Sequence, residues 1–113
     1  MPFINVKTNA KLSKAQAEQI KADFGTAITA VPGKSEQWLM VNLEGEQMLY
    51  FQGSDAPAAI AEVSLFGNAS GSALDKLTGS ITDSLTKQLG ISASRVYVSY
   101  HLTQHWGWNG NNF

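Results

Sequence analysis

The order of strand-like and helix-like segments constrains the fold more than any other feature, because a strand–helix–strand pattern occurs twice. In the first half, apolar and polar side chains alternate over residues 2–9, and residues 38–43 form a strand-like segment after a helical pattern. In the second half, residues 59–66 and 95–101 flank another helical pattern. Two such units in tandem, with right-handed crossovers, place both helices on one face of a single sheet. The prediction is an α+β, two-layer fold with tandem βαβ units, in which two helices cover one face of a four-stranded mixed sheet.

Both predicted helices carry signals at their ends. Ser13 followed by Gln16 is typical of a capping box, and Ser72 followed by Asp75 predicts the same start for the second helix. Gly90 is expected to end the second helix, since glycine favours the position just after a helix. Apolar residues at helical spacing form two predicted buried stripes, namely Leu12, Ile20, Phe24, Ile28 and Val31 in the first helix and Leu74, Leu77, Ile81, Leu85 and Leu89 in the second.

Two further segments are predicted to be ordered. Residues 44–45 indicate a turn, and residues 47–52 indicate a strand that returns from it. The tail at residues 105–108 is too aromatic for a disordered end, so we expect it to pair or pack.

The composition fits a single domain over residues 1–113 and narrows the classes of function. Hydrophobic residues make up 43% of the chain, which is enough for one core. The net charge is −1 and Arg95 is the only arginine, so no basic surface is expected to bind nucleic acid. The chain has no cysteine, which excludes disulfides, thiolate zinc sites and thiol catalysis.

Metals, cofactors and membranes are not expected as partners. His101 and His105 fall at a strand end and in a loop, and no third metal ligand is evident. The glycine-containing segment 67–71 is neither a Walker motif nor a dinucleotide-binding motif. The N-terminus lacks the form of a signal peptide, and no apolar run approaches the length of a membrane span. We therefore expect a cytoplasmic protein, with leaderless export left open.

The predicted fold leaves one face of the sheet without a cover. Small domains with a bare sheet face commonly oligomerise, and a closed symmetric ring is the simplest arrangement. We expect a homo-oligomer whose subunit number this geometry does not determine.

The dipeptide Met1-Pro2 opens the first predicted strand and allows unusual chemistry. Removal of Met1, which is usual before a small residue, would leave a secondary amine at the chain terminus. The reference pKa of an α-amine is about 8, and burial lowers it further, towards the range that a general base needs. Taken alone, Pro2 is better explained as the first residue of a strand, where its missing N–H costs nothing.

Several short motifs, in order along the whole chain, carry a resemblance to a known family. They are the Pro2 strand, Gly-Lys at 33–34, Ser-Leu-Phe-Gly at 64–67, Arg-Val-Tyr at 95–97 and Gly-Trp-Asn-Gly-Asn-Asn-Phe at 107–113. Together with the duplicated plan, they resemble macrophage migration inhibitory factor and its tautomerase relatives. The resemblance implies a homotrimer in which the three sheets form a central barrel, with sites between neighbouring subunits.

The resemblance also implies roles for individual residues. Pro2 would be the catalytic base, Lys34 would pair with a substrate carboxylate, and the backbone N–H of Phe66 would reach the same carboxylate. Tyr97, from the adjacent subunit, would wall the pocket. The remaining residues implied in substrate binding are Trp38, Ser64, Ser99, Trp106, Trp108 and Phe113.

The sequence departs from the family pattern at the predicted pocket. Ser99 stands where mammalian members have asparagine, which shortens one polar contact to the substrate. Trp38 replaces a tyrosine and Trp106 a small aliphatic residue, so a bulkier pocket mouth is expected. Residues 57–61 cover the place of the mammalian Cys-x-x-Cys, which excludes thiol-oxidoreductase activity here.

The resemblance predicts a cofactor-free keto–enol tautomerase of aryl α-keto acids of the phenylpyruvate type, inactive while Met1 is retained. The alternative is a cytokine-like or host-modulating protein that binds a protein receptor and keeps only vestigial tautomerase activity. Decarboxylation and dehalogenation rank last, because such relatives bring additional arginines or a water-activating carboxylate.

Overall fold

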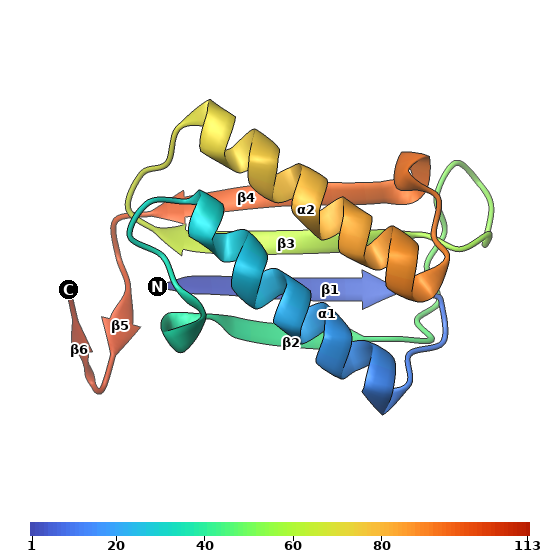
Figure 1. The fold of residues 1–113 in the computed structure, drawn as a ribbon, viewed down its shortest axis with the longest axis horizontal. Coiled ribbons are helices and arrows are strands. Elements are labelled where there is room, and N and C mark those ends of the chain that lie inside the picture. Colours follow the sequence, from blue (N-terminus) through green and yellow to red (C-terminus); the bar gives the residue numbers. More distant parts are fainter.

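The computed structural model describes all 113 residues as two layers, a sheet and a pair of helices that cross one of its faces (Figure 1). Three single-turn 3₁₀ helices, including Glu36–Trp38, lie in the connections between the strands and the α-helices. The strands and α-helices are β1 (Pro2–Thr8), α1 (Lys14–Ala27), β2 (Met40–Glu44), β3 (Ala59–Phe66), α2 (Gly71–Leu89), β4 (Val96–Thr103), β5 (Gly107–Trp108) and β6 (Asn111–Asn112).

The four long strands form one mixed sheet in the order β2-β1-β3-β4. β1 and β2 are parallel and joined by α1, and β3 and β4 are parallel and joined by α2. The two units meet through the antiparallel pair β1 and β3. The predicted tandem βαβ plan and the four-stranded mixed sheet are therefore confirmed.

The alternation along β1 and β3 sorts their side chains between the two faces of the sheet. Ile4 and Val6 in β1, and Val63 in β3, are almost fully buried beneath the helices, whereas their neighbours point to the other face. Apolar residues of the helices complete one core, which contains Ile20, Phe24, Ile28, Leu77, Ile81 and Leu85. These are members of the stripes predicted from helical spacing.

The helix ends confirm two of the predicted signals and correct a third. Ser13 and Gln16 form the predicted capping box, and Gly90 ends α2 in the left-handed conformation. The start of α2 differs, because the hydroxyl of Ser70 accepts the hydrogen bond from the N–H of Ala73 at 3.2 Å. The Ser72 hydroxyl faces that of Ser70 at 3.2 Å instead, so Ser72 is not the N-cap.

The segment between β2 and β3, residues 45–58, contains no return strand, so the prediction for residues 47–52 was wrong. One isolated bridge joins Phe51 to Ser54 across a tight turn. Side chains of Asn9 and Arg95 bind the backbone carbonyls of this segment, which takes the place of strand pairing. β2 also begins at Met40, two residues later than predicted, since Trp38 lies in the preceding 3₁₀ helix.

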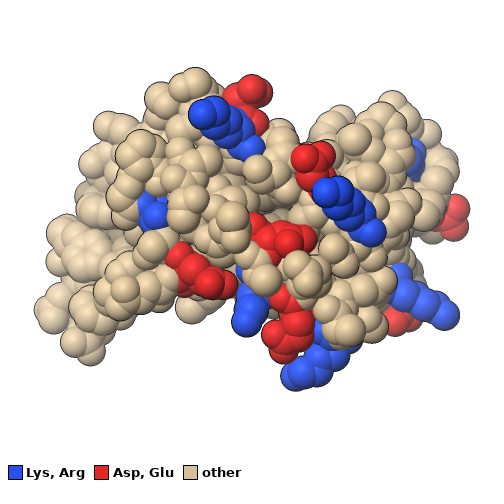
Figure 2. Space-filling view, viewed as in Figure 1, with Lys and Arg blue, Asp and Glu red and all other residues tan.

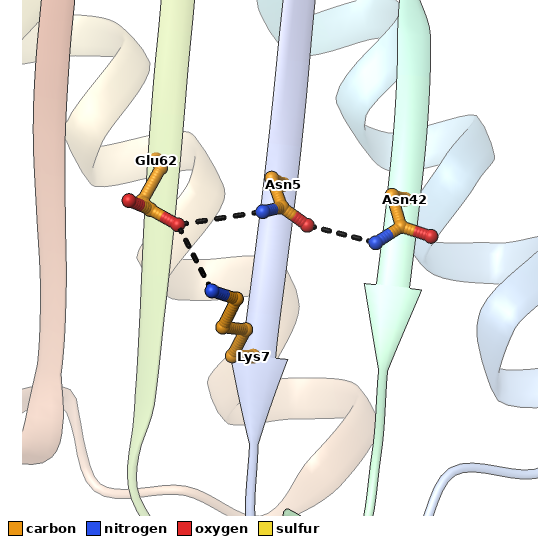
Figure 3. A network of polar contacts seen from close by, with 4 residues as sticks. All are labelled: Asn5, Lys7, Asn42 and Glu62. Atoms are coloured by element: carbon orange, nitrogen blue, oxygen red, sulfur yellow. Dashed lines mark hydrogen bonds and ion pairs between the residues drawn. The ribbon is translucent and has the colours of Figure 1, made fainter.

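The sheet face opposite the helices is polar at its centre (Figure 3). Asn42 donates a hydrogen bond to Asn5 at 2.8 Å, and Asn5 donates one to Glu62 at 3.3 Å. Lys7 lies 3.8 Å from the same Glu62 carboxylate. Large apolar side chains are exposed towards the two ends of this face, including Met40 at one end and Tyr97 at the other.

Charges on the helical side of the molecule are mixed in sign. Figure 2 shows lysines and carboxylates interspersed over this face, without a continuous basic stripe. Neither helix combines the length and the apolarity that crossing a bilayer requires.

Candidate functional site

Pro2 lies at the first position of β1, an interior strand, and is buried. Its Cα partner across the sheet is Leu65, near the end of β3. The end of the sheet at which Pro2 lies is therefore also the end at which β3 leads into the connection to α2. The C-terminal segment reaches the same edge, since the Phe66 and Phe113 ring centroids are 5.3 Å apart.

The ammonium group of Lys34 lies at this end of the sheet. Its Nζ donates a hydrogen bond to the carbonyl oxygen of Phe66 at 2.7 Å and lies 5.9 Å from the centroid of the Phe66 ring. The side chain is half-buried, in the short connection that follows α1. The structure thus brings together Lys34, Phe66 and the first residues of β1.

Met1 contacts both Phe66 and Lys34. Its carbonyl oxygen accepts a hydrogen bond from the Phe66 N–H at 3.1 Å. The pKa of the Met1 α-amine is lowered from 8.0 to about 6. Burial is the largest cause, and the hydrogen bond and positive charge of Lys34 act in the same direction. An amine at this position is therefore largely neutral near pH 7.

Aromatic rings gather at the same end of the sheet. The rings of Trp38 and Trp108 meet edge to face, with centroids 5.2 Å apart and an interplanar angle of 84°. The N–H of Phe113 donates to the carbonyl of Trp106 at 3.0 Å, which closes the C-terminal hairpin of β5 and β6. Trp106 is thus placed near the site by its backbone.

The C-terminal hairpin was missed in the sequence, although pairing or packing of the tail was predicted. Asn109 and Gly110 both have positive φ, of 53° and 83°, and form the turn between β5 and β6. An Asn-Gly pair is a strong signal for a two-residue hairpin turn. It could have located this hairpin.

Two predicted site residues do not lie near Pro2 in the same chain. Tyr97 is opposite Ile60 and, across β3, level with Lys7. That is five residues along β1, or roughly 17 Å at about 3.3 Å per residue. Ser99 is three residues from Pro2 by the same register, level with Asn5.

Ser64 pairs with Phe3, next to Pro2 along β1, and its side chain lies on the open face. His101 is its partner on β4, on the same face, while His105 lies in the loop after β4. No group of three or more His, Cys, Asp or Glu side chains is arranged to hold a metal ion.

Comparison with known proteins identifies relatives along the entire chain. The family model of macrophage migration inhibitory factor matches residues 1–113. Macrophage migration inhibitory factor of Xenopus tropicalis is 29% identical over 115 residues, covering 100% of this chain and 99% of the relative. The homolog from Trichinella spiralis is 30% identical over 119 residues, with all of both chains covered.

Solved structures agree with this assignment. The crystal structure of Leishmania major MIF2 superposes with a TM-score of 0.93 at 35% identity, covering 100% of this chain and 97% of the other. Macrophage migration inhibitory factor of Toxoplasma gondii, at 21% identity, shares the fold with a TM-score of 0.90, covering 98% and 99% of the two chains. The chain belongs to the macrophage migration inhibitory factor family.

Proposed function

We propose that the chain is a cofactor-free keto–enol tautomerase of aryl α-keto acids of the phenylpyruvate type. The observation that carries the proposal is the grouping at the start of β1. There Pro2 is buried, and the residue before it, Met1, contacts both the Lys34 ammonium and the backbone N–H of Phe66. The base is the Pro2 amine, which becomes free when Met1 is removed.

The substrate carboxylate binds to the Lys34 ammonium and the Phe66 N–H, which orients the carbon next to the keto group towards the Pro2 nitrogen. Pro2 removes a proton from that carbon while electrons move onto the keto oxygen, and the protonated Pro2 amine then delivers the proton to that oxygen to give the enol. The reverse sequence gives the keto form. Lys34 also stabilises the negative charge that develops on the enolate.

The surroundings favour a neutral amine at this position. The Met1 α-amine, one residue before Pro2, has its pKa lowered to about 6 by burial and by Lys34. The same two effects would act in the same direction on a free Pro2 amine. A base of this kind is deprotonated at neutral pH and ready to accept a proton.

The aryl group of the substrate packs against Trp108 and Phe113, with Trp38 at the mouth of the pocket. Tyr97 lies at the far end of its own sheet, so it would reach a Pro2 site only from a neighbouring copy. We therefore propose a homotrimer in which each site is shared between two subunits. Ser99 would face the same shared pocket, and Ser64 and Trp106 would lie at its margins.

The direct test is the rate of phenylpyruvate ketonisation, followed by ultraviolet absorbance, after intact-mass measurement has shown that Met1 is absent. The variants Pro2→Ala and Pro2→Gly replace the rigid ring amine by a primary α-amine that the chain no longer holds in one orientation, and they should lose most of the turnover. An unchanged rate in either variant refutes the role of Pro2.

A receptor-binding role is the second candidate, favoured by the names of the relatives, which describe an effect on macrophages. In that case a protein receptor would be the partner, and catalysis would be vestigial. Full receptor binding by the Pro2→Gly variant, with catalysis abolished, would separate this role from the enzymatic one.

A further inference from the structure

Arg95, the only arginine in the chain, binds the segment between β2 and β3 rather than a carboxylate. Its Nη2 lies within hydrogen-bond distance of three carbonyl oxygens, and its Nε donates to a fourth at 3.0 Å. These carbonyls belong to Phe51 (3.1 Å), Ser54 (3.2 Å), Ala56 (3.1 Å) and Pro57. The planar guanidinium group carries five donors in a rigid fork, which suits such a set of acceptors.

Asn9, at the end of β1, binds the same segment from a second direction. Its Nδ2 donates to the carbonyls of Leu49 at 3.1 Å and of Asp55 and Ala56 at 3.0 Å each. Its Oδ1 accepts from the N–H of Ala58 at 2.9 Å. Arg95 and Asn9, called the loop clamp below, thus hold residues 45–58 through backbone groups, whatever side chains those residues carry.

Arg95 of the loop clamp contacts Phe51 through both its backbone carbonyl and its ring. The guanidinium carbon of Arg95 is 5.2 Å from the centroid of the Phe51 ring. The ring of Tyr97 packs on the Phe51 ring, with the two centroids 4.8 Å apart and an interplanar angle of 68°. Tyr97 is 60% exposed, and its edge-to-face contact with the Phe51 ring restrains the orientation of its own ring.

We infer that Arg95 is a positioning residue, which acts through Phe51 to hold the Tyr97 ring ready to wall the substrate pocket of a neighbouring copy. The inference rests on the proposed function, because only that function places Tyr97 at a substrate. Arg95 itself lies level with the far end of the sheet from Pro2 and takes no part in proton transfer. Loss of the loop clamp should therefore affect binding of the aryl group and leave proton transfer unchanged.

The kinetic test uses Arg95→Met, Phe51→Leu, Tyr97→Leu and the double variant Arg95→Met/Tyr97→Leu. Phe51→Leu keeps the backbone carbonyl that Arg95 binds but removes the ring that contacts Tyr97, so it tests the pathway even if Arg95→Met fails to fold. Each single variant should raise KM for phenylpyruvate about three- to tenfold, the value of one aromatic contact. In Arg95→Met and Phe51→Leu, which alter no proposed substrate contact directly, the turnover number and the pH profile should stay as in the parent.

Two comparisons separate positioning from general damage. An alkyl α-keto acid without a ring should show an unchanged KM in Arg95→Met and in Phe51→Leu, and with phenylpyruvate the double variant should be no worse than Tyr97→Leu alone. Lys87→Met, which removes an exposed cation at the end of α2, is the matched control. Additive effects, or an equal loss on the alkyl substrate, would overturn the inference.

A readout independent of catalysis keeps this inference distinct from the proposed function. The ring current of Phe51 should shift the Tyr97 ring resonances in aromatic nuclear magnetic resonance spectra, and Arg95→Met or Phe51→Leu should abolish that shift. Arg95→Lys should restore it only in part, since lysine carries three donors and no planar fork. Unchanged Tyr97 resonances in Arg95→Met would refute positioning even in an active enzyme, whereas a lost shift in an inactive protein would refute only the tautomerase assignment.

Discussion

The backbone N–H of Phe66 donates a hydrogen bond to the carbonyl oxygen of Met1, with a nitrogen–oxygen distance of 3.1 Å. This N–H is one of the two groups proposed to bind the substrate carboxylate. The second group, Lys34, lies beside the Met1 amine. Met1 would therefore compete for the proposed carboxylate site, and it acylates the Pro2 nitrogen, which removes its basic lone pair.

The first prediction is that the Met1-retaining form neither catalyses tautomerisation nor binds aryl carboxylates. Preparations with and without Met1 can be separated by intact mass and titrated with an inert aryl carboxylate such as phenylacetate. Treatment with methionine aminopeptidase should restore both binding and turnover of phenylpyruvate. Tight phenylacetate binding by the Met1 form would show that Met1 does not occupy the carboxylate site.

The second prediction concerns pH and the stability of the Met1-retaining form. The Met1 amine has a pKa of about 6 in the folded chain, lowered from 8.0, so the unfolded chain binds this proton more tightly. The amine therefore makes the free energy of unfolding rise with pH between about 6 and 8. Below pH 6 the amine is protonated in both the folded and the unfolded chain, and its destabilisation of the folded chain is at its full size. Urea unfolding between pH 5.5 and 8.5 measures this slope.

The Lys34→Met variant is the control for that slope. Removal of the neighbouring cation should raise the amine pKa towards its usual value and flatten the dependence on pH between 6 and 8. An equal slope in the parent and in the variant would mean that Lys34 does not act on the amine.

The third prediction is that Lys34→Ala raises KM for phenylpyruvate about 10- to 100-fold, the usual effect of losing a hydrogen bond to a charged group. The methyl ester of the substrate, which lacks the carboxylate charge, should be affected much less. Lys76→Ala, an exposed lysine on α2, serves as the control and should behave as the parent. An equal loss on acid and ester would contradict the proposed pairing.

The fourth prediction compares two serines at the start of α2. Ser70→Ala removes the hydroxyl that accepts from the Ala73 N–H, and should lower the free energy of unfolding by about 1 kcal/mol. Ser72→Ala should change it by less than about 0.5 kcal/mol, since it lies on the surface after the cap. Chemical denaturation of both variants measures the difference, and the reverse order would restore Ser72 as the cap.

The sequence alone was enough to predict the layers of this fold. Alternation in residues 2–9 and 59–66 depends only on which side chains avoid water, so it identified the buried faces of β1 and β3. The capping box of Ser13 and Gln16 and the end of α2 at Gly90 depend on neighbours within one turn of the chain. Patterns of such short range can be read without knowing the tertiary structure.

The tertiary structure decided which polar groups are partners across long stretches of chain. Residues 47–52 have a strand-like pattern, but no strand pairs with them. Instead, the side chains of Asn9 and Arg95 bind carbonyls in and around this segment. These two residues lie about 40 positions before and after it in the sequence. In the tertiary structure, Lys34 also contacts the backbone of Phe66, whereas Tyr97 lies at the opposite end of the sheet. Spacing along the sequence does not encode such contacts, because they depend on the register and packing of strands that are distant in the chain.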